Sequence, residues 1–139
     1  MWSKDFDKWN TLKQQLDSSE TEVYFKPREV WYCSIGVNVG REEDGHNDLF
    51  ERPILILKVF SAQLFWGVSL TSRLKPENLY YLSFRHDGVE YSAIISQLRL
   101  LDAKRLIRKL YTISPASFNE IQLRLIEEMA TTETKSDSQ

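Results

Sequence analysis

The chain has 139 residues, of which 42% are hydrophobic, and its formal net charge is −2. This length and composition suit one ordinary domain with a single packed core. The small negative charge gives no sign of a nucleic-acid partner, and Cys33, the only cysteine, excludes an internal disulfide and a cysteine zinc cluster. No apolar run is long enough to cross a bilayer, and the N-terminal stretch MWSKDFDKWN lacks the basic-then-apolar order of a signal peptide. We therefore expect a soluble, cytoplasmic protein.

The charges are unevenly distributed along the chain. Residues 1–51 carry a net charge of −5, residues 52–109 carry +6, and residues 110–139 carry −3. A cationic middle segment can bind phosphate groups even when the whole protein is acidic. Composition favours equally a surface on which both signs mix once the chain folds, so both interpretations stay open.

An amphipathic helix is predicted over residues 2–18. Apolar side chains recur there at steps of three and four, which places them on one helical face: Trp2, Phe6, Trp9, Leu12 and Leu16. The stripe needs a partner surface, either the body of the domain or another chain. The stretch SSETE that follows is typical of a linker, so residues 1–22 are expected to form a helical extension.

From Pro27 onward the pattern changes to that of strands. The segments REVWYCSIG, RPILILKVF, QLFWGVSLT and NLYYLSFRHDGVEYSAIIS are rich in apolar, aromatic and β-branched residues. The pair Asp87-Gly88 stands between two alternating runs and predicts a tight hairpin. Five strands are expected between residues 28 and 95. Short strands joined by tight turns favour a small barrel or a rolled sheet, because closure protects the strand edges.

Helical patterns return after the strands. Asp102 can cap a helix over AKRLIRKL, residues 103–110. Ser114 followed by Pro115 is typical of a helix start. The helix that follows places four apolar side chains on one face: Phe118, Ile121, Leu125 and Met129.

The two ends therefore differ from the middle of the chain. The final stretch TTETKSDSQ is polar and has no apolar anchor, so we expect residues 131–139 to be disordered. Residues 23–130 are expected to form the folded domain, which residues 1–22 precede.

Four segments in this order resemble the MazF/PemK-like toxins, the ribonuclease components of toxin–antitoxin pairs. REVWYCSIGVNVGREE followed by RPILIL is similar to the first two strands of that family. GVSLTSR is similar to the third strand, and SQLRLLDAKRLIRKL to the Gln-x-Arg-x-x-Asp-x-x-Arg-Leu segment. The resemblance covers residues 27–129, and its specificity comes from the order of the four pieces.

The resemblance implies a fold, an activity and partners. The fold is mainly β with flanking helices: an SH3-like small β-barrel with a C-terminal helix, to which this chain adds an N-terminal helix. The activity is metal-independent cleavage of single-stranded RNA such as mRNA, with the loop between the first two strands shaping sequence preference. No cofactor is expected. The implied partners are a second copy of the chain and a small antitoxin, whose flexible acidic segment occupies the RNA groove and whose head binds DNA.

The resemblance also implies two catalytic residues. Arg52 matches the arginine that precedes a proline at the start of the second strand, and Thr71 matches the threonine at the end of the third. RNA carries its own nucleophile, the 2′-hydroxyl, so cleavage requires proton transfer and stabilisation of a crowded phosphorane. An arginine fork can pair two phosphate oxygens, and a threonine hydroxyl can bond a phosphate oxygen or the 2′-hydroxyl.

Seven further residues are candidates for substrate binding: Arg41, Glu42, His46, Ser69, Ser72, Ser96 and Gln97. Gln97 is expected to order the backbone near the site, and His46 can supply a proton carrier from the long loop. Each has a simpler alternative. Arg52 can form a salt bridge with Glu42, Glu43 or Glu51, and a loop histidine is commonly just solvated.

The chain also departs from the family pattern. Some members carry an arginine and an aspartate on the last strand, where this sequence has Ile94 and Ser96. The loop over residues 42–51 is longer than the common form. Two alternatives to an active ribonuclease therefore stay open: a catalytically weak or inactive RNA- or protein-binding barrel of the same fold, and a purely structural dimerisation module.

Overall fold

The computed structural model describes residues 3–20, 22–73 and 80–131. Trp2 and nearly all of the tail predicted to be disordered, residues 132–139, lie outside the described residues. No helix within the described ranges is long and apolar enough to cross a membrane.

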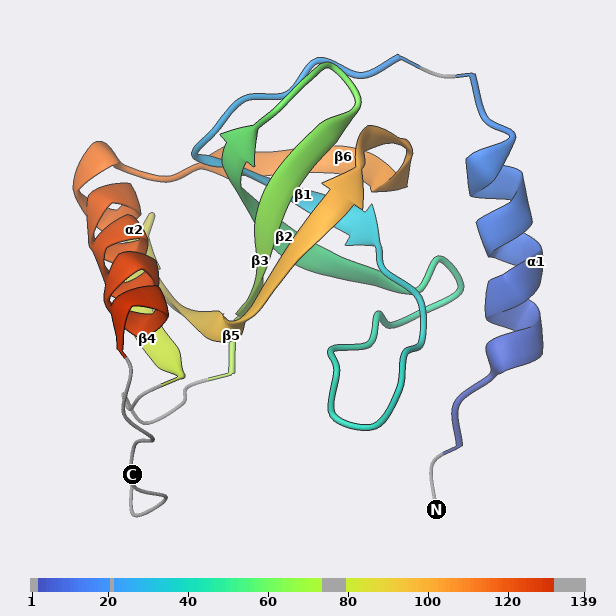
Figure 1. Cartoon of the computed structure of the whole chain (residues 1–139), viewed down its shortest axis with the longest axis horizontal. Helices are drawn as coiled ribbons and strands as arrows, with labels where there is room; N and C mark the ends of the chain where they lie inside the picture. Colours follow the sequence, from blue (N-terminus) through green and yellow to red (C-terminus); the bar gives the residue numbers. More distant parts are fainter. Residues whose placement is uncertain (1–2, 21, 74–79, 132–139) are drawn as a thin grey trace.

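The fold is one antiparallel sheet with a helix at each end of the chain (Figure 1). The predicted mainly β architecture with flanking helices is confirmed. The strands lie in the order β4-β5-β3-β2-β1-β6, and among the described residues β4 and β6 do not pair, so the barrel is not closed. The elements are α1 (Phe6–Asp17), β1 (Glu29–Ser34), β2 (Glu51–Val59), β3 (Leu64–Thr71), β4 (Tyr81–His86), β5 (Val89–Asp102), β6 (Leu106–Thr112) and α2 (Pro115–Ala130).

The strand β2 is buried on both of its faces. Leu55 and Leu57 belong to a core cluster that includes side chains of α2, whereas Ile54 and Ile56 belong to a second cluster around Phe65. A strand covered on both faces is apolar at successive positions rather than at alternating ones. This explains the continuous run PILIL in the sequence.

The predicted hairpin is confirmed between β4 and β5. Asp87 and Gly88 both have positive φ, as a type I′ turn requires, and His86 pairs with Val89 across the turn. β5 then continues beside β3, where the register shifts between Val68 and Leu70. The shift leaves β5 with extra residues between Ala93 and Leu98, so the segment that holds Ser96 and Gln97 bulges from the ladder.

The prediction of a helix over residues 103–110 is wrong. Asp102 does cap a turn, because its carboxylate accepts from the Lys104 amide at 2.8 Å, but this is only the three-residue 3₁₀ helix Ala103–Arg105. The chain then extends as β6, which pairs with β1. Pairing with a strand more than 70 residues away in sequence overrides the local helical pattern, and the pairing lengthens the sheet.

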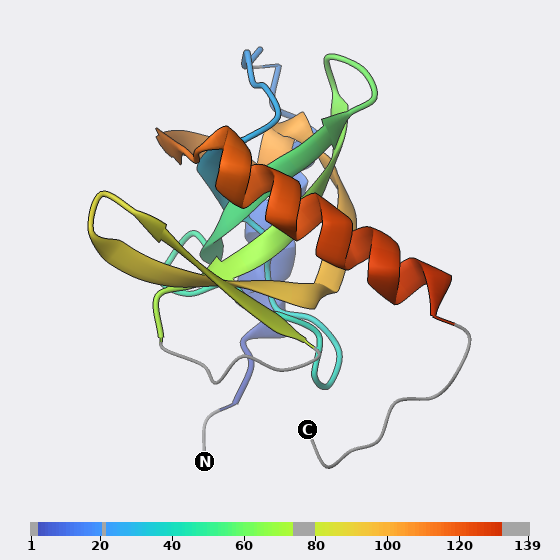
Figure 2. The same ribbon diagram turned by 90° about the vertical axis from the view of Figure 1, so that its left-hand side faces the viewer.

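The C-terminal helix begins as predicted. The Ser114 side chain accepts from the Ser117 amide at 3.1 Å, and Pro115 is the first helical residue. Ile121 and Leu125 are buried against the sheet, and α2 crosses its face (Figure 2). Met129, which was predicted to share that face, lies in the last turn of the helix and is 66% exposed, so it adds little to the core.

The helix α1 lies at the opposite end of the molecule from α2 (Figure 1). Trp9 is buried with Val37 and Phe50 of the β1–β2 loop, residues 35–50, and its ring centroid lies 5.5 Å from that of Phe50. Leu12 and Leu16 pack against this cluster, but Phe6 is 52% exposed, so the predicted stripe holds only in part. The helix therefore docks on its own chain.

Replacing Trp9 tests this docking. Trp9→Ala should lower the free energy of unfolding by about 3 kcal/mol, because it removes a buried indole and leaves a cavity against Phe50. The matched control is Phe6→Ala on the same helix, which should change stability by less than about 0.5 kcal/mol because the ring is half-exposed. Urea denaturation followed by circular dichroism measures both. Equal effects of the two variants would contradict the docked position of Trp9.

Candidate functional site

A cavity of about 480 Å³ opens where the β1–β2 loop meets the start of β2 and the end of β3. The pairing of Ile54 with Ser69 brings these two strand ends together. Four of the residues singled out in the sequence line the cavity: Arg52, Thr71, Ser72 and His46. The remaining wall includes Tyr32, Glu43, Glu51, Arg73, Tyr81 and Ile94.

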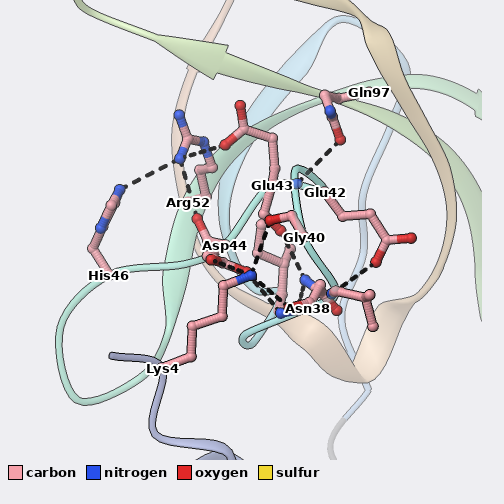
Figure 3. A network of polar contacts seen from close by, with 11 residues as sticks. Lys4, Asn38, Gly40, Glu42, Glu43, Asp44, His46, Arg52 and Gln97 are labelled. Atoms are coloured by element: carbon pink, nitrogen blue, oxygen red, sulfur yellow. Dashed lines mark hydrogen bonds and ion pairs between the residues drawn. The ribbon is translucent and has the colours of Figure 1, made fainter. Parts of the chain in front are cut away.

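Arg52 is the most constrained cation of the cavity. Its Nη1 atom forms an ion pair with Glu43 Oε2 at 2.8 Å and donates to the Asp44 carbonyl oxygen at 3.1 Å. His46 Nε2 lies 3.4 Å from the same nitrogen. The Arg52 side chain is 14% exposed, and Figure 3 shows Glu43 and His46 on two sides of its guanidinium group. All three contacts of the loop are thus with Nη1, one of the two terminal nitrogens of the guanidinium group.

The Nε atom of Arg52 is buried without a hydrogen-bond partner among the described residues. Buried donors without partners are rare, and each needs a functional or solvent explanation. The ion pair expected as an alternative role for Arg52 is present, with Glu43 rather than with Glu42 or Glu51. The pair and a catalytic role are compatible, since a guanidinium group has five N–H donors.

Thr71, the last residue of β3, lines the cavity. Its Oγ1 atom accepts from the Arg73 amide at 3.2 Å, and this contact uses a lone pair of the oxygen rather than the hydroxyl proton. The residue is buried except for the part that lines the cavity. A hydroxyl fixed in this way can donate to an oxygen atom of a bound group.

The other predicted site residues lie elsewhere. Arg41, Glu42, Ser96 and Gln97 line a second depression together with Arg99. Gln97 Oε1 accepts from the Glu43 amide at 3.2 Å, so the β5 bulge is tied to the residue that pairs with Arg52 (Figure 3). Ser69 lines neither depression, because it is buried opposite Ile54.

Sequence reasoning treated Glu43 only as one of three acids near Arg52. The conformation of the loop determines which of these acids pairs with Arg52. Glu42 Oε1 accepts from the Val39 amide instead, and Glu51 Oε2 lies 3.6 Å from Arg108 Nη1. Nothing in the sequence gave a reason to single out Tyr32. This residue lines the cavity and carries Arg108 over its ring at 4.3 Å.

The only thiol has no part in this site. Cys33 is fully buried in the core around Phe65, and burial raises the pKa of its thiol well above the ordinary range. A thiol that stays protonated is a poor nucleophile. Among the residues that the structure describes, no three histidine, cysteine, aspartate or glutamate side chains form a group that could hold a metal ion.

Comparison with known proteins identifies the fold. Neither a protein-family model nor a curated protein matches the sequence. Among solved structures, the chain is similar to MazF from Deinococcus radiodurans, with a TM-score of 0.62 and 19% identity over 79% of this chain and 100% of that one. The chain has the MazF fold. The fold implied by the sequence resemblance is therefore confirmed.

Two further structures with the MazF fold are complexes. MazE–MazF from Deinococcus radiodurans matches with a TM-score of 0.60 and 16% identity, over 80% of this chain and 100% of that one. An endoribonuclease in complex with its cognate antitoxin, from a Mycobacterial species, matches with a TM-score of 0.60 and 15% identity over the same shares.

Proposed function

We propose that this chain is the toxin component of a toxin–antitoxin pair, a cytoplasmic endoribonuclease that cleaves single-stranded RNA without a metal ion. The observation that carries the proposal is the position of Arg52, which is held at the wall of a cavity that Thr71 and His46 also line. The MazF fold supports it, since two of the similar solved structures are described as endoribonucleases.

The reaction begins with attack of the RNA 2′-hydroxyl oxygen on the adjacent phosphorus. The 2′-oxygen–phosphorus bond forms, the phosphorus–5′-oxygen bond breaks, and the products carry a 2′,3′-cyclic phosphate and a 5′-hydroxyl. One proton leaves the 2′-hydroxyl and one reaches the 5′-oxygen. Arg52 stabilises the charge of the phosphorane, and Thr71 donates to one of its oxygens.

Two groups beside Arg52 can move these protons. A phosphate that binds the guanidinium group displaces Glu43, which pairs with Nη1 in the free protein, and the released carboxylate accepts the 2′-hydroxyl proton. His46, on the other side of Arg52, protonates the leaving 5′-oxygen. This pair replaces the arginine and aspartate that some members of the family carry on the last strand.

The proposed partners follow from the same comparison. Solved structures with this fold include complexes with an antitoxin, and we propose that an acidic segment of a cognate antitoxin competes with RNA for Arg52. We also propose that the chain is a homodimer, because α2 leaves three large apolar side chains exposed: Leu123, Ile126 and Met129.

The second candidate function is an RNA- or protein-binding barrel without activity. The observation that favours it is Ile94, a buried aliphatic residue in the cavity wall where some relatives of the fold carry a charged catalytic group. A short upstream gene that encodes a DNA-binding head and an acidic tail would support a toxin pair, and growth arrest on induction would separate an active toxin from an inactive one.

Arg52 provides the direct test of activity. Purified protein should cleave single-stranded RNA with a chelator present and leave a 2′,3′-cyclic phosphate. Arg52→Ala should lower the rate by about a hundredfold or more, because it removes the main countercharge to the phosphorane. Thr71→Ala should cost less, since a neutral hydroxyl makes a weaker hydrogen bond. Full activity of Arg52→Ala, or cleavage that stops when metal is removed, would contradict the mechanism.

Glu43 and His46 provide the test of proton transfer. Glu43→Gln keeps the size of the side chain and removes its basicity, and His46→Ala removes the proton donor, so each should lower kcat by about a hundredfold. Asp48→Asn is the matched control, because it makes the same change of charge in the same loop at a side chain that is 93% exposed and pairs with Lys8. Multiple-turnover cleavage of a short single-stranded RNA measures kcat for the three variants and the wild-type protein. A wild-type kcat in Glu43→Gln and His46→Ala would leave both residues as structural parts of the loop.

The oligomeric state has its own measurement. Sedimentation equilibrium should give the mass of a dimer, and Ile126→Glu should shift the mass toward the monomer because it places a charge among the exposed apolar side chains of α2. A monomeric mass at high protein concentration would contradict the proposed homodimer.

A further inference from the structure

The β1–β2 loop is bound on two sides. One side faces the cavity, where Glu43, the Asp44 carbonyl oxygen and His46 contact Arg52. The other side faces the N-terminal segment, from which Lys4 extends into the loop (Figure 3). The loop is therefore the layer between α1 and the candidate site.

Lys4 binds three groups of this loop with one ammonium group. Its Nζ atom donates to the Asn38 carbonyl oxygen at 2.6 Å and to the Gly40 carbonyl oxygen at 3.1 Å, and it lies 3.1 Å from Asp44 Oδ2. An ammonium group has three donors and no acceptor, so the loop satisfies all of its hydrogen-bonding capacity. The Lys4 and Asp44 side chains are only 19% and 15% exposed, which limits screening of the pair by solvent.

Asp44 connects Lys4 to Arg52 within a single residue. Its carboxylate pairs with Lys4 and accepts from the Asn38 amide at 2.6 Å, while its carbonyl oxygen accepts from Arg52 at 3.1 Å. A shift of Asp44 would therefore move an acceptor of the guanidinium group. It would also move Glu43, the preceding residue and the ion-pair partner of Arg52.

The helix that carries this segment is seated closely on the same loop. Gly36 has a φ of +79°, and a Cβ atom at this position would lie 2.0 Å from Trp9 Cε2. The backbone of the loop thus touches the indole ring directly. Lys8 also reaches the loop, at Asp48, but this pair is 52% and 93% exposed and has no contact with Arg52 among those the structure shows.

We propose that Lys4 is a positioning residue for RNA cleavage: it fixes Asp44, and with it the part of the loop that orients Arg52. The inference rests on the proposed function. It assigns to the N-terminal extension a part in catalysis, because each of the three contacts that the structure shows for Lys4 goes to the β1–β2 loop.

The kinetic test compares Lys4→Met with Lys8→Met, two variants that remove the same charge from neighbouring positions. Lys4→Met should lower kcat by between about tenfold and a hundredfold with a smaller change in KM, because Arg52 is displaced from where the phosphorane charge develops. Lys4→Arg should restore most of the rate, since it keeps a cation with several donors. Lys8→Met should leave kcat and KM unchanged, because an exposed pair contributes little.

A spectroscopic readout separates this inference from the proposed function. In ¹H–¹⁵N NMR spectra, the Nε–Hε signal of Arg52 and the amide signals of residues 38–46 should shift or broaden in Lys4→Met. The same signals should stay in place in Lys8→Met, whether or not the protein cleaves RNA. An unchanged Arg52 signal in Lys4→Met overturns the inference, as does a wild-type kcat of that variant when the wild-type protein is active. A displaced Arg52 signal in a protein that cleaves no RNA supports the positioning and overturns the proposed function.

Discussion

The contact between the Arg52 guanidinium group and the β1–β2 loop is the constraint on which the candidate site depends. A cation that is 14% exposed loses most of its hydration, and this loss is costly unless acceptors replace the water. The loop supplies a carboxylate from Glu43 and a carbonyl oxygen from Asp44. One of the acidic residues of the loop, Glu43, is therefore explained by the need to balance the charge of the largely buried Arg52.

The backbone of Arg52 is held by the sheet while its side chain is held by the loop. Arg52 pairs with Cys33 of β1, and the following residue, Pro53, restricts the arginine to an extended conformation. Strand β2 lies between β1 and β3 and has a core cluster on each face, so its start has little freedom to move. A group that must meet a charge at a defined position benefits from such a rigid support.

The mixed charge of the cavity has a consequence for ligands. Glu43 lies 2.8 Å from the nitrogen that a phosphate oxygen would contact, so the two anions compete for one side of the guanidinium group. Only a ligand with several contacts, such as a polynucleotide or an acidic peptide, gains enough elsewhere to displace an intramolecular carboxylate. In the free protein the cation is therefore neutralised, and this limits binding of small anions.

Much of the fold can be read from local patterns. The five strands, the Asp87-Gly88 turn and the helix start at Ser114 and Pro115 each depend on interactions between near neighbours, and the structure confirms them. The same holds for part of the site: Arg52 and Thr71 share a cavity because they stand at the ends of consecutive antiparallel strands.

Other features were decided only by the tertiary structure. Residues 103–110 have a helical pattern, but most of them belong to the strand β6, because β1 is available to pair with it. The sequence alone places three acids near Arg52, and the loop path selects Glu43. No pattern in the sequence indicates a role for Lys4, because its contacts are with residues 34 to 40 positions away along the chain. Periodicity, caps and turns are set by a few adjacent residues and are visible in a sequence, whereas strand partners and loop contacts depend on which distant segments the folded core brings together.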